Sequence, residues 1–187
     1  MNLSDVTAVI PTRGDVDLAP ILATLTGYRE VIVWVSQVGC WGRYLAMKSA
    51  RTEFVYTQDD DLIFTAHRQL LDLHSPGRIT ANMPSPWYEG AGYDVEQSVQ
   101  VGAGSVMHCE AHVAAVASYL ACWPDDDDFR VYCDDVVGIL TPSLRVDLGY
   151  QVLDCASASN RIWTQPGARQ RRNMVAGRAL DLRANGC

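Results

Sequence analysis

The pattern of apolar and polar residues predicts short strands that alternate with short helices. Apolar, β-branched runs at residues 6–10, at Glu30–Val35 and from Phe54 onward are typical of buried strands. Helical spacing predicts helices between them, at residues 18–25 and 41–50. Strands and helices in this alternation, with short connections, form a parallel sheet with right-handed crossovers. The first third of the chain therefore predicts an α/β fold.

The rest of the chain continues this pattern less regularly. Strands are expected at residues 79–83, 97–101 and 151–153, and helices at residues 67–74, 110–120 and from Cys133 to a break near Pro142. Between them, residues 84–93 combine three aromatic side chains with prolines and glycines, which is typical of a loop that covers a substrate. We expect one domain over residues 1–187, with a mostly parallel central sheet flanked by helices.

Three consecutive acids, Asp59, Asp60 and Asp61, follow the third predicted strand. The carboxyl ends of strands in an open α/β sheet form the edge at which ligands bind. Adjacent carboxylates repel one another unless a cation or hydrogen-bond donors compensate their charge. Oxygen ligands of this kind suit Mg²⁺ or Mn²⁺, and these ions usually also bind substrate phosphates. The three acids therefore predict a divalent metal site that holds a nucleotide diphosphate, and a solvated acidic turn is the alternative.

The order of several short motifs resembles the GT-A glycosyltransferases. Arg43 lies on a predicted helix sixteen positions before Asp59, and the acids after the strand resemble the family's DxD motif. Downstream, Asp134 and Asp135, followed by Gly-Tyr-Gln-Val at 149–152, resemble its "ED … GYxV" segment. Residues 166–172 are similar to the segment of exostosin-like members that closes on the diphosphate. The resemblance implies a Rossmann-like GT-A domain with a donor half at 1–75, an acceptor half at 76–160 and a basic segment at 161–187.

The resemblance also implies roles for individual residues. Asp59 and Asp61 would bind Mn²⁺ or Mg²⁺, and Asp134 or Asp135 would lie beside the acceptor hydroxyl. The family differs from this chain at Ala168, where its members often carry a histidine that binds the metal. The residues expected near the base, the ribose or the diphosphate of the donor are Pro11, Thr12, Arg13, Ser36, Arg43, Asp59, Asp60, Arg171 and Arg172.

These roles imply a metal-dependent transfer of a sugar from a nucleotide-diphosphate sugar, in this family most commonly a uridine diphosphate sugar, to a hydroxyl group. A carboxylate at the acceptor would act as the base of an inverting reaction, whereas an exostosin-like enzyme would retain the configuration without such a base. A non-catalytic module that binds a nucleotide sugar is an alternative. A nucleotidyltransferase would carry a Gly-rich basic loop after the first strand, and a DxDxT phosphatase would carry threonine in place of Ile63.

Charge is distributed unevenly along the chain. The net charge is −7, but from Arg161 onward there are six arginines and one acid. A basic segment on an acidic body usually faces the diphosphate, a nucleic acid or the body itself. A compact chain with this tail and an aromatic loop resembles small phage enzymes that glycosylate hydroxymethylated pyrimidines in DNA, and a saccharide or small-molecule hydroxyl is the alternative acceptor. Residues 125–128, all acids, are expected to form a solvated turn.

Composition limits the class of protein. With 48% hydrophobic and 20% charged residues, the chain is typical of soluble globular proteins. Its six cysteines are scattered without a CxxC pair, which favours reduced thiols in a cytoplasm over a disulfide framework or a zinc site. No apolar run is long enough to span a bilayer, and residues 1–5 lack the basic and apolar regions of a signal peptide. We therefore expect a cytoplasmic protein.

Overall fold

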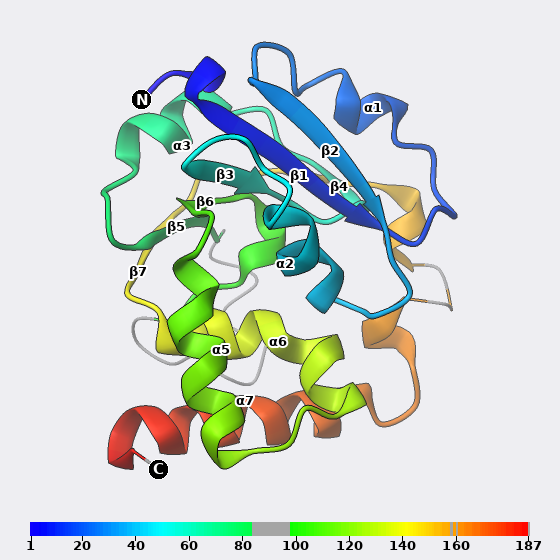
Figure 1. Cartoon of the computed structure of the whole chain (residues 1–187). Coiled ribbons are helices and arrows are strands. Elements are labelled where there is room, and N and C mark those ends of the chain that lie inside the picture. Colours follow the sequence, from blue (N-terminus) through cyan, green and yellow to red (C-terminus); the bar gives the residue numbers. More distant parts are fainter. Residues whose placement is uncertain (84–97, 158, 160, 187) are drawn as a thin grey trace.

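A six-stranded sheet forms the centre of the molecule. The computed structural model describes residues 1–83, 98–157, 159 and 161–186. The strands of the sheet are β1 (Val6–Thr12), β2 (Glu30–Val35), β3 (Phe54–Thr57), β5 (Ile79–Asn82), β6 (Ser105–His108) and β7 (Ser143–Val146), in the order β2-β1-β3-β6-β5-β7 (Figure 1). β6 is antiparallel to both neighbours, and the other three pairs are parallel. The predicted α/β fold with a mostly parallel sheet is confirmed.

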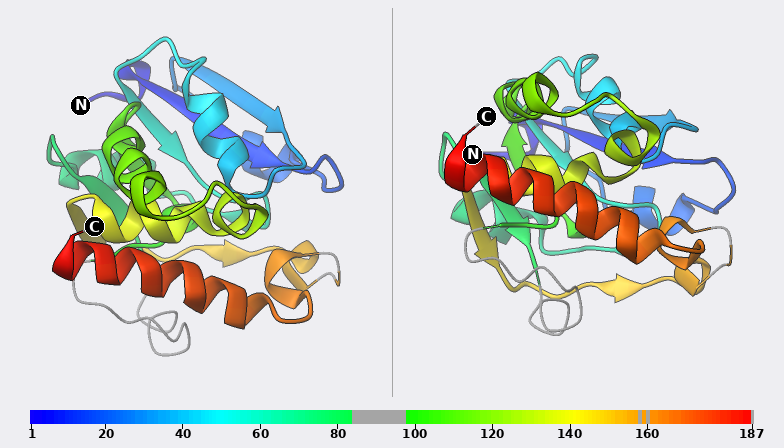
Figure 2. Two further views of the ribbon diagram at one scale, coloured as in Figure 1. Left: turned by 60° about the horizontal axis from the view of Figure 1, so that its bottom comes forward. Right: turned by 90° about the horizontal axis from the view of Figure 1, so that it is seen from below.

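Helices cover both faces of the sheet and divide the core in two (Figures 1 and 2). One face is covered by α2 (Trp41–Met47), α5 (Ala111–Cys122), α6 (Asp127–Leu140) and α7 (Ala168–Asn185), and the other by α1 (Ala19–Leu22) and α3 (His67–Leu73). Side chains of a strand point alternately to the two faces. Along β1, Val9 is buried in the first core, whereas Ala8 and Ile10 are buried in the second.

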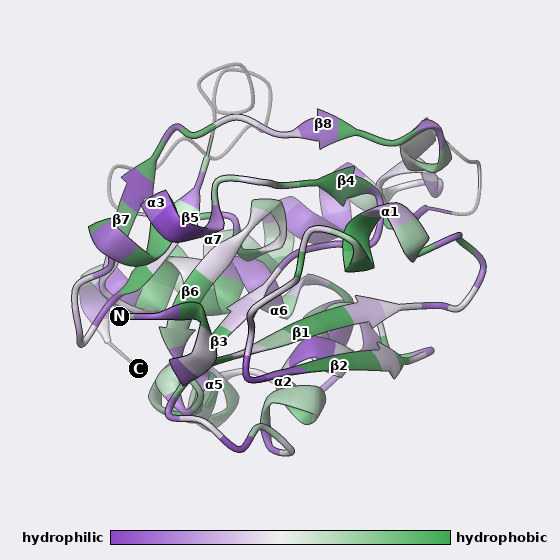
Figure 3. Ribbon diagram, turned by 90° about the horizontal axis from the view of Figure 1, so that it is seen from above, coloured by the Kyte–Doolittle hydropathy of each residue, from purple (hydrophilic) through white to green (hydrophobic). Residues whose placement is uncertain are grey.

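A second, smaller sheet lies on the α1 side of the molecule. It pairs β4 (Leu62–Ile63) with β8 (Gln151–Val152) in antiparallel register, beside α1 in Figure 3. The backbone N–H of Leu153 donates to the Asp61 carbonyl at 2.8 Å. This pair of strands therefore brings the segment after β8 next to the acidic turn. The short 3₁₀ helices are η1 (Leu3–Asp5), η2 (Val101–Ala103), η3 (Asp154–Ser157) and η4 (Ile162–Thr164).

The two longest helices differ from the sequence prediction. α6 begins at Asp127 instead of Cys133, because the Asp126 side chain accepts a hydrogen bond from the Phe129 N–H at 2.8 Å and caps an earlier start. The helix is kinked at Tyr132, where φ is −114° and ψ is 19°, so the part after the kink begins where the sequence predicts. The basic tail was assigned no helix, but residues 168–185 form α7, which packs its small residues against α6.

The strands differ from the prediction in two places. The segment expected to be a strand up to Val101 enters η2 instead, because the Val99 N–H bonds to the Gly138 carbonyl of α6 and not to a neighbouring strand. β6 and β7 were not predicted, since each has only four residues and neither shows a long apolar run. The aromatic loop proposed at 84–93 lies outside the described residues.

Across the described ranges, none of the helices is long and apolar enough to cross a membrane. The prediction of reduced thiols agrees with the free cysteines Cys40, Cys109, Cys133 and Cys155. It is wrong for Cys122, which is disulfide-bonded.

A buried histidine in the second core predicts acid sensitivity. His67 packs edge-on against the rings of Tyr56 and Phe64, and its Nδ1 is 3.0 Å from the Tyr28 hydroxyl. Burial lowers the pKa of His67 from 6.5 to about 4. Protonation therefore favours the unfolded chain, so the stability that this group contributes is complete above about pH 6.5 and is lost as the pH falls toward 4. At pH 5 the expected loss is about 2 kcal/mol relative to pH 7.

The measurement is the free energy of unfolding in urea between pH 7 and pH 5. His67→Gln removes the titrating ring and should flatten the pH dependence. His112, whose pKa is also lowered to about 4 by burial, should account for much of the slope that remains. An unchanged slope in the His67→Gln variant would contradict the assignment.

Candidate functional site

The acidic turn after β3 is held in shape from inside the protein. Gln58 is fully buried, and its amide Nε2 donates to the Leu62 carbonyl at 2.7 Å and to the Asp59 carbonyl at 3.3 Å. The Tyr56 hydroxyl in turn donates to Gln58 Oε1 at 2.6 Å. On the other side, the Asp59 N–H donates to the Gly102 carbonyl at 2.7 Å. The turn is thus preformed by buried hydrogen bonds rather than being a loose solvated loop.

Arg43 of α2 joins the acidic turn to α6. The side chain is fully buried, and Nη1 donates to Thr57 Oγ1 at 2.7 Å. Nη2 donates to the Asp59 carboxylate and also contacts Asp134 Oδ2 at 3.1 Å. Burial lowers the pKa of Arg43, but the charges of Asp134 and Asp59 raise it more, and the net shift is upward. A buried guanidinium needs such partners, so Arg43 is fixed between the two acids.

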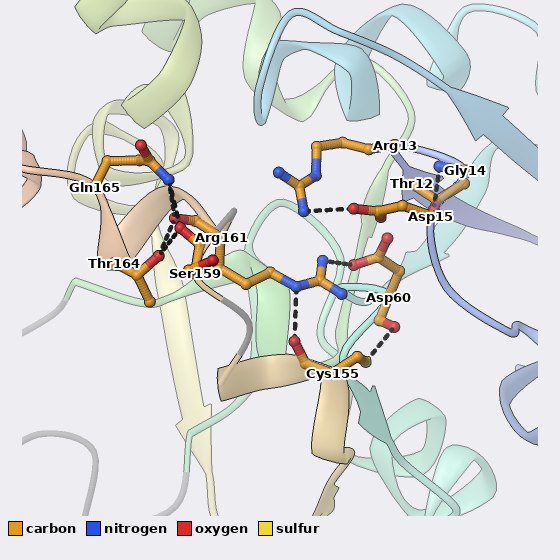
Figure 4. A network of polar contacts seen from close by, with 10 residues as sticks. All are labelled: Thr12, Arg13, Gly14, Asp15, Asp60, Cys155, Ser159, Arg161, Thr164 and Gln165. Carbon is orange, nitrogen blue, oxygen red and sulfur yellow. Dashed lines mark hydrogen bonds and ion pairs between the residues drawn. The ribbon is translucent and has the colours of Figure 1, made fainter.

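Asp60 points to the other side of the turn and forms a buried ion pair with Arg161 (Figure 4). The distance from Arg161 Nη1 to Asp60 Oδ1 is 2.7 Å, and Arg161 Nε also donates to the Cys155 carbonyl at 3.1 Å. Asp60 Oδ2 is buried and has no hydrogen-bond partner among the described residues. Nothing local in the sequence indicates this role of Arg161, because its partner lies 101 positions away.

Breaking this ion pair should destabilise the fold. Arg161→Gln would leave the carboxylate of Asp60 buried beside an uncharged group, which typically costs about 3–5 kcal/mol. The measurement is urea unfolding at neutral pH. The double variant Asp60→Asn with Arg161→Gln removes both charges, so it should recover a large part of the loss. A single variant as stable as the parent would show that the pair contributes nothing.

Asp59 and Asp61 are the carboxylates that remain for a cation. The Asp59 side chain is 47% exposed, although Arg43 contacts one of its oxygens. Burial, and after it the charge of Asp59, raises the pKa of Asp61 to about 6, while Arg161 opposes the shift. The two acids thus lie close enough to repel each other, and a divalent cation between them would relieve that repulsion.

This donor set fits a cation that is completed by substrate. The described residues contain no group of three or more His, Cys, Asp or Glu side chains arranged for a metal ion. Mg²⁺ and Mn²⁺ are often held by one or two carboxylates, and substrate phosphates and water supply the other ligands. Asp59 and Asp61 match that pattern, whereas an all-protein metal cage does not fit the residues present.

The two acids of α6 have different surroundings. Asp134 follows the kink, and its Oδ1 accepts a hydrogen bond from the Tyr44 hydroxyl at 2.7 Å. Asp135 accepts two bonds from Arg172, from Nε at 2.8 Å and from Nη2 at 3.0 Å. The Asp134 side chain is 14% exposed and that of Asp135 is 3% exposed. Burial raises the pKa of Asp134, and Arg43 acts in the opposite direction.

The carboxyl ends of β1 and β2 form a second part of the candidate site. The sheet extends beyond the predicted strand end, so Pro11 lies within β1, opposite Trp34. The Ser36 N–H donates to the Thr12 carbonyl at 2.9 Å, which places these two residues side by side. Arg13 forms an ion pair with Asp15 at 2.9 Å (Figure 4). Thr12, Arg13 and Ser36 therefore stand together where the parallel strands end.

The basic tail faces the acidic body of its own chain. Arg171 pairs with Asp128 at 3.4 Å, and Arg178 with Asp126 at 3.7 Å. Arg172 and Arg161 pair with Asp135 and Asp60 as described above. The acids at residues 126–128 are thus the N-cap and first turn of α6, and they bind arginines of α7. Three partners were expected for the basic segment: the diphosphate, a nucleic acid or the acidic body of the chain. The structure shows ion pairs with the acidic body.

The structure brings together residues from four separate stretches of sequence. Asp59, Arg43 and Asp134 form one connected group, to which Asp135 and Arg172 are adjacent on α6 and α7. The contacts by which Tyr44, Gln58 and Arg161 support these acids were not predicted from the sequence. A glutamine directly before the acids was visible, but nothing local indicated that its side chain closes the turn.

Comparisons with known proteins add little to this description. No protein family and no curated protein matches the sequence. One solved structure with a related chain path is the crystal structure of S. aureus TarS 1-349, with 11% sequence identity and a TM-score of 0.43. The match covers 97% of this chain and 74% of that one. A likeness this distant supports no conclusion about activity.

Proposed function

We propose that the protein is a metal-dependent glycosyltransferase that moves a sugar from a nucleotide-diphosphate sugar to a hydroxyl group. The observation that carries this proposal is the connected group Asp59–Arg43–Asp134, in which one buried guanidinium joins a candidate metal ligand to a candidate base. The order of motifs in the sequence, which resembles the GT-A family, agrees with it. The division into donor and acceptor halves at residue 75 stays a prediction.

Asp59 and Asp61 would hold Mn²⁺ or Mg²⁺. When bound, the cation neutralises charge that develops on the leaving diphosphate. Arg172 would add to this: burial lowers its pKa, and the nearby charge of Asp59 only partly offsets that shift. Arg171 is 44% exposed and paired only at 3.4 Å with Asp128, so exchange of that carboxylate for a phosphate costs little.

The nucleoside would lie along the ends of β1 and β2. Thr12, Arg13 and Ser36 stand there, beside the turn that carries Asp60. Uridine as the base rests on the family resemblance alone.

We assign the base to Asp134. It is more exposed than Asp135, so it is the acid that an acceptor hydroxyl can approach more easily. Asp134 would take the proton of the acceptor hydroxyl while the oxygen of that hydroxyl forms its bond to the anomeric carbon of the sugar. The bond from that carbon to the diphosphate breaks with its electron pair on the diphosphate, and the configuration inverts. Both acids have partners on both oxygens, so the choice rests on exposure, and the nearly buried Asp135 suits a residue that positions Arg172.

The acceptor is a hydroxyl-bearing molecule. A hydroxymethylated pyrimidine in DNA as the acceptor stays a prediction. It was expected partly from the basic tail, and four arginines of that tail pair with acids of the same chain. A saccharide or small-molecule hydroxyl needs no basic surface. Binding to hydroxymethylated duplex DNA at two salt concentrations tests the first acceptor, because contacts with phosphates weaken as salt rises.

The experiment that tests the proposed function is a thermal-shift screen of nucleotide sugars with and without Mn²⁺. A ligand that binds the folded state raises the melting temperature, so a uridine diphosphate sugar should raise it more when Mn²⁺ is present. Release of nucleoside diphosphate from the best donor then separates an enzyme from a binding module. No metal-dependent shift with any donor would contradict the proposal.

A further inference from the structure

Gly102 lies against the carboxylate of Asp59. It is the central residue of η2, and its carbonyl accepts the Asp59 N–H at 2.7 Å. A Cβ placed on Gly102 would be 2.6 Å from Cγ and 2.8 Å from Oδ1 of Asp59, and nearer still to Oδ2. Such distances are far below van der Waals contact. The Asp59 carboxylate therefore occupies the space that any other side chain at position 102 would need.

The backbone of Gly102 does not itself require glycine. Two residues later, Gly104 has φ of 103°, a conformation that other residues rarely adopt, and Gly102 is not among the glycines with positive φ. The reason for glycine at position 102 is thus space for the carboxylate.

Neither partner can move away easily. The Ser105 hydroxyl donates to the Val101 carbonyl at 2.9 Å, and Asn82 Nδ2 donates to the Ala103 carbonyl at 3.1 Å, which fixes η2 on both sides of Gly102. The Asp59 carboxylate is held by Arg43. An added methyl group would have to turn the carboxylate away from its present place.

We propose that Gly102 is a positioning residue for the metal ligand Asp59. This rests on the proposed function, in which Asp59 binds the cation. Gly102 leaves room for one arrangement of the carboxylate, in contact with Arg43 on one oxygen while the side chain stays half exposed. Metal ligands held in place by packing and hydrogen bonds bind better than ligands that must first be ordered.

The test compares Gly102→Ala with Gly177→Ala. Gly177 lies on α7 with nothing within 4 Å of an added Cβ, so it controls for the gain of a methyl group. The probe is Mn²⁺ alone, and free Mn²⁺ is measured by electron paramagnetic resonance. Gly102→Ala should weaken Mn²⁺ binding by about tenfold or more, the lower end of the effect of altered ligand support. Gly177→Ala should bind like the parent. A smaller change in Gly102→Ala overturns the inference.

A second measurement separates positioning from a general packing defect. If the added methyl clashes with the carboxylate, the loss of melting temperature caused by Gly102→Ala should largely disappear in an Asp59→Ala background. An equal loss in both backgrounds overturns the inference, because Gly102 would then serve packing that does not involve Asp59. A parent protein that binds no Mn²⁺ even with uridine diphosphate added would instead contradict the proposed function, and the melting temperatures would still report on the contact.

Discussion

Replacing Asp59 and Asp61 together by asparagine is expected to abolish metal-dependent donor binding and to lower turnover by roughly 1,000-fold or more. The physical reason is that the cation stabilises charge on the leaving diphosphate by several kcal/mol, and about 4 kcal/mol corresponds to that factor. Asparagine keeps the size of each side chain and a hydrogen-bond acceptor for Arg43, so the change is mainly one of charge. The measurements are the Mn²⁺-dependent thermal shift with donor and the rate of sugar transfer.

The matched control is Asp125→Asn. Asp125 is half exposed and pairs with Arg130 at 2.9 Å, away from the turn. Its replacement removes one negative charge but should leave Mn²⁺-dependent donor binding unchanged. If the double variant retained the metal-dependent shift of the parent, Asp59 and Asp61 would not hold the cation, and the central part of the proposed function would be wrong.

Asp134→Asn is expected to lower kcat by about 100- to 10,000-fold while the donor still binds, because a general base contributes about that factor to the chemical step. Asparagine can still accept the Tyr44 hydroxyl bond but cannot take a proton from the acceptor. The measurement is single-turnover transfer at saturating donor, together with the donor Kd from thermal or calorimetric titration.

Asp135→Asn serves as the comparison on the neighbouring residue. Because Asp135 is almost fully buried and paired with Arg172, its replacement should lower kcat less and should mainly disturb the arginine. The opposite ranking would assign the base to Asp135. If neither change affected kcat, the reaction would retain the configuration without a base, which the anomeric configuration of the product reports independently.

The features that sequence could predict are those recorded by local patterns. β2 matches the predicted bounds because its apolar, β-branched run is typical of a strand, although it is an edge strand with Val31, Val33 and Val35 exposed. β3 is largely buried and ends at Thr57, two residues before the first of the three acids. The prediction that Asp59 and Arg43 belong to one site rested on the family resemblance, and the structure places them in contact.

What sequence could not supply is which distant residues meet. Hydrophobic periodicity shows that a residue is buried but not what it contacts, so the pairs Asp60–Arg161 and Asp135–Arg172 had no local signal. The same holds for the contact between Gly102 and Asp59, since a glycine between two predicted elements is usually explained by a turn. α7 was missed because its apolar face consists mostly of small residues.

The ion pair between Asp60 and Arg161 has a consequence for how the protein is made. Domains generally begin to fold during synthesis, starting from the N-terminal side. The strands β1, β2 and β3 can associate early, but the carboxylate of Asp60 has no counter-charge until Arg161 has been translated, about 100 residues later. On the ribosome, the acidic turn should therefore stay open long after the strands beside it have paired.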